Sequence, residues 1–140
     1  MRITRYITSI ILILAVLATL VTGCNSKVDI EAELGQQFSL YFGQTAEIKG
    51  EKLEITFVEI PEDSRCPSDV TCIWEGRVRC RLEMKYQGTY YEVVLTQPGL
   101  SYDYESGIFE GYSLSFKVEP CPLSDVTLSA GDYYIYLTVS

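Results

Sequence analysis

From Phe38 to the C-terminus, apolar and polar residues alternate with a period of two. No stretch has apolar residues at positions i, i+3, i+4 and i+7 over three turns, as an amphipathic helix would require. The alternation is clearest in residues 77–85, where every odd position is charged and the even positions hold Val78, Cys80, Leu82 and Met84. Because successive side chains of a strand point to opposite faces, these four residues are assigned to the core. The sequence therefore predicts an all-β domain.

The two strands that flank Gln87 and Gly88 predict their own pairing. A two-residue turn at these positions pairs Tyr86 with Thr89. On the inward face this register brings together only uncharged, largely apolar partners: Met84 with Tyr91, Leu82 with Val93, and Cys80 with Leu95. On the outward face it sets Glu83 opposite Glu92, a like-charge pair that Arg81 relieves from a diagonal position. We expect this outward face to be solvated.

Strands are expected at 38–42, 46–49, 53–60, 77–86, 90–96, 112–119, 126–128 and 133–139. The same alternation assigns further residues to the core: Leu53, Ile55, Phe57, Tyr112, Leu114, Phe116, Val118, Ile135, Leu137 and Val139. Seven or eight short strands in roughly 100 residues favour a two-sheet antiparallel sandwich. The Gly131-Asp132 turn before a Tyr-rich strand is typical of the tyrosine corner of an immunoglobulin-like sandwich, in which a Tyr hydroxyl bonds back across the turn. A small β-barrel is the alternative.

Residues 1–23 differ from the rest of the chain. Arg2 and Arg5 precede an apolar run that ends in Val21-Thr22-Gly23-Cys24, and the run is short for a membrane span, which needs roughly 20 apolar residues. The segment resembles a bacterial lipoprotein signal peptide, and its last four residues resemble a lipobox. An ordinary signal peptide or a short membrane anchor is the alternative.

The lipobox interpretation predicts three parts of the chain. They are a cleaved signal peptide (1–23), a lipidated Cys24 with a tether (24–36), and the β-sandwich domain (37–140). It also predicts an extracytoplasmic protein held on the membrane by its lipid. Because Asn25 is not the aspartate that retains lipoproteins at the inner membrane, we expect the outer membrane in a Gram-negative host, and otherwise the outer face of the cytoplasmic membrane.

Composition excludes several kinds of function. The chain has no His, which rules out Ser-His-Asp triads, Cys-His dyads and zinc sites that contain His. It has 11 basic and 19 acidic residues, and removing Arg2 and Arg5 leaves 9 basic against 19 acidic, a net charge of −10 for the mature chain. Such a charge opposes binding to phosphate backbones. We expect no nucleic-acid partner, no cofactor and no metal site.

The segment 62–76 reads Glu-Asp-Ser-Arg-Cys-Pro-Ser-Asp-Val-Thr-Cys-Ile-Trp-Glu-Gly. With residues 43–57 upstream and 109–112 more loosely, it resembles an uncharacterised family of small secreted or lipid-anchored bacterial and archaeal β-domain proteins. These proteins share a D-S-R-C-P...C-x-W-x-G segment. The resemblance implies an extracytoplasmic β domain and supplies neither a reaction nor a ligand.

Four cysteines follow the lipidation site, and an oxidising compartment favours disulfides between them. Three pairings of Cys66, Cys72, Cys80 and Cys121 are open. We favour Cys66 with Cys72, which closes a short loop, and Cys80 with Cys121, because Cys80 points inward and Cys121 lies just past a strand. A redox switch or soft-metal site at Cys66 and Cys72 is disfavoured by the absence of a CxxC spacing. We expect Trp74 to cover the short disulfide.

Two segments supply a candidate binding surface. Arg65 lies beside Asp63 and Asp69, where it could bind a carboxylate ligand or pin its own loop through a local ion pair. The glycine-rich loop 98–111 combines acidic residues with aromatic rings, which suit sugars or cationic partners, although a solvated hairpin tip is the alternative. It has no calcium-loop register. The predicted surface consists of Arg65, Trp74, Tyr102, Tyr104 and Phe109.

The sequence leaves two classes of function. The first is a lipid-anchored, non-catalytic sandwich that binds an envelope protein or a glycan, or plays a structural role in the envelope. The second is a protease inhibitor or a carboxylate-based hydrolase. Because the usual means of activating a nucleophile are missing, we predict that the protein is not an enzyme.

Overall fold

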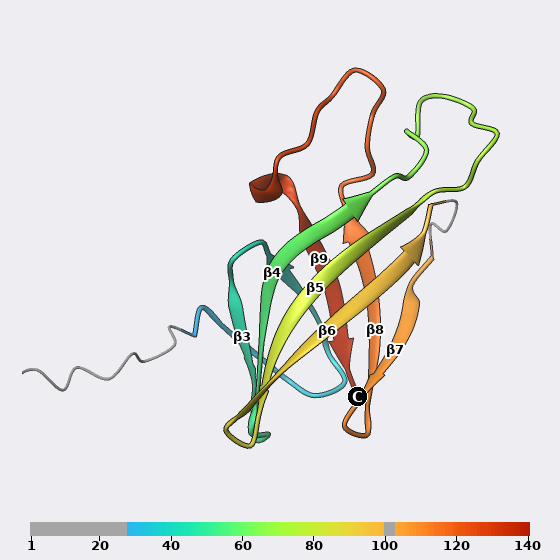
Figure 1. Ribbon diagram of the computed structural model, residues 1–140. Helices are drawn as coiled ribbons and strands as arrows, with labels where there is room; N and C mark the ends of the chain where they lie inside the picture. Colours follow the sequence, from blue (N-terminus) through green and yellow to red (C-terminus); the bar gives the residue numbers. More distant parts are fainter. Residues whose placement is uncertain (1–27, 100–102) are drawn as a thin grey trace, which may run out of the picture.

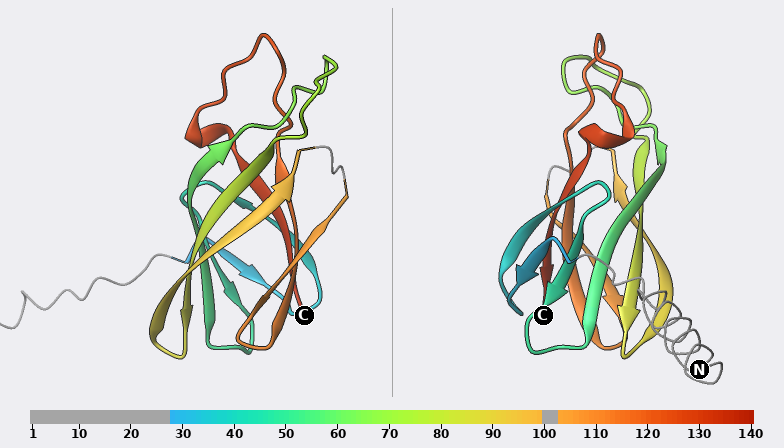
Figure 2. Two further views of the ribbon diagram at one scale, coloured as in Figure 1. Left: turned by 45° about the vertical axis from the view of Figure 1, so that its right-hand side comes forward. Right: turned by 90° about the vertical axis from the view of Figure 1, so that its left-hand side faces the viewer.

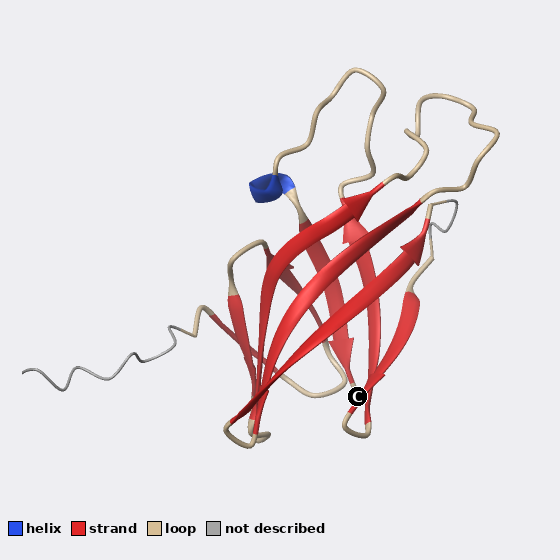
Figure 3. Cartoon of the chain, in the orientation of Figure 1, coloured by secondary structure: helices blue, strands red, loops and turns tan. Residues whose placement is uncertain are grey.

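The structure, a computed structural model, describes residues 28–99 and 103–140, so the predicted signal peptide and Cys24 lie outside the described residues. No helix in the described part is long and apolar enough to cross a membrane. The described chain forms strands and one short 3-10 helix (Figures 1 and 3): β1 (Ile30–Ala32), β2 (Gln37–Tyr41), β3 (Thr45–Ile48), β4 (Leu53–Asp63), β5 (Arg77–Tyr86), β6 (Thr89–Pro98), β7 (Glu105–Phe109), β8 (Tyr112–Glu119), η1 (Ala130–Asp132) and β9 (Tyr134–Val139).

The strands form two sheets that lie face to face (Figure 2). One sheet has the order β1-β3-β4-β5-β6 and the other the order β2-β9-β8-β7. All pairs are antiparallel except β1 with β3, which is parallel. Among the described strands the two sheets do not close on each other, so the predicted two-sheet sandwich is confirmed and the barrel alternative is not formed. The first sheet contains four consecutive strands side by side, β3 to β6, and the second contains three, β7 to β9. The immunoglobulin order divides consecutive strands differently between its sheets.

The hairpin of β5 and β6 has the predicted register. Tyr86 pairs with Thr89, and the inward pairs and the Glu83–Glu92 pair all lie as expected. Gln87 and Gly88 form the turn, and both have positive φ angles, 50° and 86°. A two-residue turn of this kind matches the right-handed twist of its strands, and it therefore fixes the register of the longest pairing in the molecule.

The core lies between the sheets. Every core residue that the alternation predicted in β4, β8 and β9 is buried, except Tyr112, which is half-buried. The core draws on both sheets and is made by residues between Ala32 and Val139. A chain that begins at Ser26 therefore contains the whole folding unit described here.

Three strand predictions need correction. The segment 126–128 is not a strand but part of the long connection between β8 and η1. β1 falls in the segment predicted as a tether, where it adds an edge strand in parallel to β3. β7 falls in the segment predicted as a loop, where Phe109 pairs with Tyr112 and packs into the core. Both missed strands are short edge strands, and each pairs with a single neighbouring strand. Neither is long enough for alternation of its own residues to predict it.

The tyrosine corner also differs from its prediction. Tyr133, immediately before β9, is 7% exposed, and its hydroxyl donates to the Asp63 carboxylate at 3.0 Å rather than back across the turn. Asp63 ends β4 in the other sheet. The hydroxyl therefore ties the two sheets together at one end of the sandwich.

Candidate functional site

Two long loops project from one end of the sandwich (Figures 1 and 2). The first connects β4 to β5 (residues 64–76), and the second leads from β8 into η1 (residues 120–132). We call these two segments together the loop end. It contains most of the D-S-R-C-P...C-x-W-x-G segment.

A buried arginine fastens the bases of the two loops. The Arg65 side chain is 1% exposed, and its Nε and Nη2 donate to the two Asp63 oxygens at 2.9 and 2.7 Å. Its Nη1 donates to the Val118 carbonyl at 3.0 Å and Nη2 to the Pro120 carbonyl at 2.8 Å. Burial works to lower the pKa of Arg65, but the hydrogen bond and charge of Asp63 outweigh it, so the pKa is raised. The predicted local ion pair is present, whereas Arg65 as part of a binding surface is wrong, because the side chain is enclosed.

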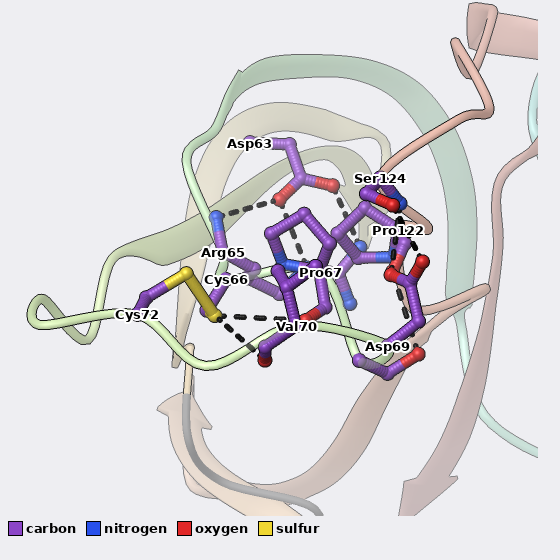
Figure 4. The surroundings of a disulfide bond; sticks show 10 residues. Asp63, Arg65, Cys66, Pro67, Asp69, Val70, Cys72, Pro122 and Ser124 are labelled. Atoms are coloured by element: carbon purple, nitrogen blue, oxygen red, sulfur yellow. Dashed lines mark hydrogen bonds and ion pairs between the residues drawn. A yellow bond between two sulfur atoms is a disulfide. The ribbon is translucent and has the colours of Figure 1, made fainter.

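A second clamp joins the outer parts of the loops (Figure 4). Asp69 accepts hydrogen bonds from the Ser124 backbone N–H at 2.9 Å and from the Ser124 hydroxyl at 2.5 Å. These bonds lower the pKa of Asp69. The Ser68 N–H donates to the Pro122 carbonyl at 3.0 Å. Asp69, which we expected near Arg65, instead holds the first loop against the second.

The disulfide between Cys66 and Cys72 closes the tip of the first loop, as predicted. Its Cα atoms are 5.9 Å apart, and Figure 4 shows it on the side of the loop away from Ser124. In the chain-entropy description, a bridge across so short a loop contributes about 2 to 3 kcal/mol. The first loop is thus braced three times: by the disulfide, by Arg65 and by Asp69.

Cys80 and Cys121 are not bonded to each other, so the second predicted disulfide is wrong. The Val118 N–H donates to the Gln97 side chain at 2.7 Å, and Gln97 pairs with Val78, which places Val118 and Val78 at one level of the sandwich. Cys80 lies two residues deeper than Val78, and Cys121 lies three residues beyond Val118. Five residue steps correspond to roughly 16 Å of extended chain, whereas bridged Cα atoms lie within about 7 Å.

We therefore predict two free thiols of unequal reactivity. Cys80 is fully buried, and burial raises its pKa to about 12, whereas Cys121 is half-buried. Titration of Ser26–Ser140 with an aromatic disulfide reagent should find two thiols after denaturation without reductant, but only Cys121 should react in the folded protein. Cys121→Ser should abolish the native reaction. A native reaction that persists in this variant would contradict the assignment.

The loop end exposes apolar side chains. Ile73 is 99% exposed and Trp74 is 59% exposed, so the prediction that Trp74 belongs to an exposed surface holds, whereas its covering of the disulfide stays a prediction. Other large apolar residues that both loops leave exposed are Val70, Leu123 and Val126. Sequence reasoning singled out Trp74 alone. The available signal for Ile73 was its place between Cys72 and Trp74, in a loop with no alternation to assign it to the core.

Charge at the loop end has one sign. The exposed ionisable residues of the two segments are all acidic: Asp69, Glu75, Asp125 and Asp132. Neither segment contains Lys or Arg apart from the enclosed Arg65. The exposed apolar side chains therefore lie in a negative field.

The remaining predicted surface residues are dispersed. Phe109 is 7% exposed, with its ring edge-to-face against Tyr86 and Tyr91, so its assignment to the surface is wrong. Tyr104 is 46% exposed and reaches across the four-stranded sheet. Tyr102 lies outside the described residues. Among the predicted surface residues that the structure describes, Trp74 alone is exposed at the loop end.

An open hollow of about 350 Å³ lies away from the loop end, on the outer face of the five-stranded sheet. It is bordered by the charged rows of β5 and β6, where Arg81 pairs with Glu59 and, at 3.2 Å, with Glu92. This is the solvated face that the sequence predicted. In the described ranges no three Asp, Glu or Cys side chains gather closely enough to hold a metal ion.

Comparison with protein families, with curated proteins and with solved structures finds no match for this chain. The resemblance of residues 62–76 to the D-S-R-C-P...C-x-W-x-G proteins thus stays a prediction.

Proposed function

We propose that the protein is a non-catalytic binding module, anchored outside the membrane through a lipid on Cys24, that holds a partner protein at its loop end. The observation that carries the proposal is the exposure of Ile73 and Trp74, 99% and 59%, on a loop that is otherwise tightly braced. Exposed apolar side chains that cluster on one surface are typical of protein interfaces, and Trp is among the residues that most often dominate binding energy.

The rigidity of the first loop supports a binding role for its exposed side chains. A flexible loop loses conformational entropy when it binds, whereas a loop already fixed in place does not. Here the disulfide, the buried Arg65–Asp63 pair and the Asp69–Ser124 clamp order the loop before any partner arrives. The energy of contacts at Ile73 and Trp74 is therefore available for affinity.

Two observations support the proposed location of the module. The Cys66–Cys72 disulfide is consistent with an oxidising, extracytoplasmic compartment. The Val-Thr-Gly-Cys tetrad supports lipidation of Cys24. A diacylglycerol on Cys24, with its two acyl chains, would keep the domain at the membrane surface with the loop end free to meet envelope proteins.

The test uses cells that produce the full chain, with partners captured by crosslinking at the surface. Replacing both Ile73 and Trp74 by Ala should weaken binding of the captured protein about 30-fold or more, because central apolar anchors contribute roughly 2 kcal/mol or more. The free energy of unfolding should change little, since both side chains are exposed. Affinity is measured with the purified partner and Ser26–Ser140 by calorimetry.

Tyr90→Ala is the matched control, because Tyr90 is 58% exposed beside the turn that joins β5 to β6, at the other end of these strands from the loop with Ile73 and Trp74. It should leave affinity unchanged. Cys24→Ser should move the complex from the membrane to the soluble fraction without weakening it. A partner that binds the double variant as well as the wild type would overturn the loop-end assignment. A Cys24→Ser protein that has lost its signal peptide and still stays on the membrane would overturn the anchor.

Protease inhibition is a second candidate, favoured by the near-complete exposure of Ile73 beside a disulfide. A braced loop that presents one apolar side chain fits a protease specificity pocket. Inhibition would show as a loss of activity of an extracellular protease with apolar specificity, abolished by Ile73→Asp. The same protein would then be the partner captured above.

A further inference from the structure

The outer face of the four-stranded sheet carries a group of tyrosines that the loop end does not use. Tyr41 of β2 pairs directly with Tyr134 of β9, and their ring centroids are 5.2 Å apart. Tyr134 and Tyr136 lie on the same face of β9, with centroids 5.4 Å apart and rings perpendicular. Three rings thus form a continuous aromatic row across two strands.

A fourth tyrosine crosses the same face. The Gln37 side-chain amide donates to the Tyr104 hydroxyl. Gln37 begins β2 and Tyr104 immediately precedes β7, and these two strands are the opposite edges of the sheet. The two side chains therefore meet above β9 and β8, over the small residues Ser115 and Thr138, which pair with each other beside Gln37. We call Tyr41, Tyr104, Tyr134 and Tyr136 the tyrosine face.

The tyrosine face is electrically neutral, although the protein as a whole is acidic. The outward positions of β2, β9 and β8 hold Tyr, Ser, Thr and Gln side chains and only two charged ones, Lys117 and Glu119. Those two charges form an ion pair at 2.8 Å. A hydrogen bond with Tyr136 and burial raise the pKa of Tyr134 to about 12, so this ring stays uncharged at physiological pH.

The other sheet shows that neutrality is not needed for folding. Its outer face consists largely of Arg, Lys and Glu side chains in cross-strand ion pairs, among them Lys85 with Glu54 and Arg81 with Glu92. Both sheets bury an apolar inner face equally well. Solubility would be served by charged residues on both outer faces. It therefore does not explain why one sheet carries rings and hydroxyls in place of charges.

We propose that the tyrosine face is a binding site for an uncharged polysaccharide. A sugar ring offers a patch of C–H bonds on its face and hydroxyls at its edge. Tyr rings supply an amphipathic surface for the C–H patch, and the Ser, Thr and Gln side chains donate to and accept from hydroxyls. This site is separate from the loop end and does not depend on the function proposed for it.

The chemistry of the face disfavours other occupants. Among the outward positions of β2, β9 and β8 there is no aliphatic side chain. The exposed Ile108 of β7 pairs with Ser113, at the end of the sheet away from Tyr41 and Tyr134. The core of a stable protein interface, in contrast, is apolar. Anionic polymers and lipid surfaces are attracted by clustered basic groups, and the one lysine of this face is already paired with Glu119. A neutral, hydroxyl-rich chain matches both the absence of free charge and the row of rings.

Affinity electrophoresis of Ser26–Ser140 tests the proposal. The native gels contain a soluble neutral polysaccharide, either β-glucan, xylan, mannan or dextran, or the anionic control alginate. At least one neutral polymer should retard the wild type, and alginate should not. The Tyr41→Ala/Tyr104→Ala double variant should bind about 30-fold more weakly, since each of the two rings contributes roughly 1 kcal/mol. Both residues are about half exposed, 50% and 46%, so the fold should survive.

Three variants distinguish the site from a general effect. Tyr41→Phe keeps the ring and should bind within about two-fold of the wild type. Tyr90→Ala, on the other sheet, and Trp74→Ala, at the loop end, should bind normally. If the double variant unfolds in urea earlier than the wild type, the single variant Tyr41→Ala decides the question.

Three results would overturn the proposal. They are retardation by no neutral polymer, retardation by alginate alone, and equal weakening by Tyr90→Ala. The neutral polymers differ in sugar and linkage, so the polymer that retards the protein identifies the type of glycan that it binds. Loss of retardation in Tyr41→Ala with retention in Trp74→Ala would establish that the two surfaces act independently.

Discussion

Replacing Arg65 by Ala is expected to lower the free energy of unfolding by about 3 to 5 kcal/mol, because it leaves a buried charge without its partner. The Arg65 side chain is 1% exposed and that of Asp63 10%. The variant would leave the Asp63 carboxylate with the Tyr133 hydroxyl and the backbone N–H of residue 65, and would free the Val118 and Pro120 carbonyls. Since domains of this size are stable by roughly 5 to 15 kcal/mol, the loss is a large fraction of the total.

Urea denaturation of Ser26–Ser140 at pH 7 measures this loss. Arg77→Ala is the matched control, because Arg77 also forms an ion pair with a nearby carboxylate, that of Glu62 at 2.9 Å, but is 54% exposed. Exposed pairs contribute at most about 1 kcal/mol, so the control should remain close to the wild type. Equal effects of the two substitutions would show that burial of the Arg65 pair does not govern the stability of the loop end.

The sandwich could be predicted from the sequence because its central strands are long and have one apolar face and one polar face. In β5 the alternation of charged and apolar residues leaves a single register open, since a shift by one residue would bury the charges. The turn at Gln87 and Gly88 then fixes the partner strand. The edge strands carry no such constraint. β1 and β7 are three and five residues long and each has one neighbour, so their sequences need not alternate strictly.

Pairing of side chains across the sandwich was harder to predict. Alternation predicts that Cys80 points inward, but it does not predict how far along the strands a residue of the other sheet lies. Cys121 follows β8 by two residues, and only the bond between Val118 and Gln97 shows that it lies beyond the end of the core. The hydroxyl of Tyr133 illustrates the same gap, because its partner Asp63 is 70 residues away. Contacts of this kind depend on tertiary geometry and leave no local pattern.

The D-S-R-C-P...C-x-W-x-G segment contains residues that fix the loop and residues that the loop exposes. Asp63 and Arg65 form the buried clamp, and Cys66 and Cys72 form the disulfide. Trp74 and its neighbour Ile73 have their side chains mostly in solvent. A side chain that folding leaves exposed, within a segment otherwise devoted to fixing the loop, is the one best placed to contact a partner.

The last residue of the segment, Gly76, provides the other large expected effect. Gly76→Ala should lower the free energy of unfolding by more than about 3 kcal/mol, because it combines backbone strain with a clash. Gly76 has a φ of +67°, which only Gly adopts without cost. A Cβ at this position would lie 1.9 Å from the Ser64 carbonyl oxygen and 2.6 Å from its carbon. Both are backbone atoms at the base of the first loop, where the Ser64 N–H also donates to the Arg77 carbonyl at 2.8 Å.

Gly50→Ala separates the two contributions. Gly50 has a similar φ of +83°, but a Cβ there would meet nothing within 4 Å. It should therefore lose only the cost of the left-handed conformation, roughly 1 to 2 kcal/mol. The difference between the two variants in urea denaturation isolates the contact with Ser64. If Gly76→Ala were no less stable than Gly50→Ala, the base of the loop would be free to move apart, and the bracing on which the proposed binding by Ile73 and Trp74 depends would be weaker than the geometry indicates.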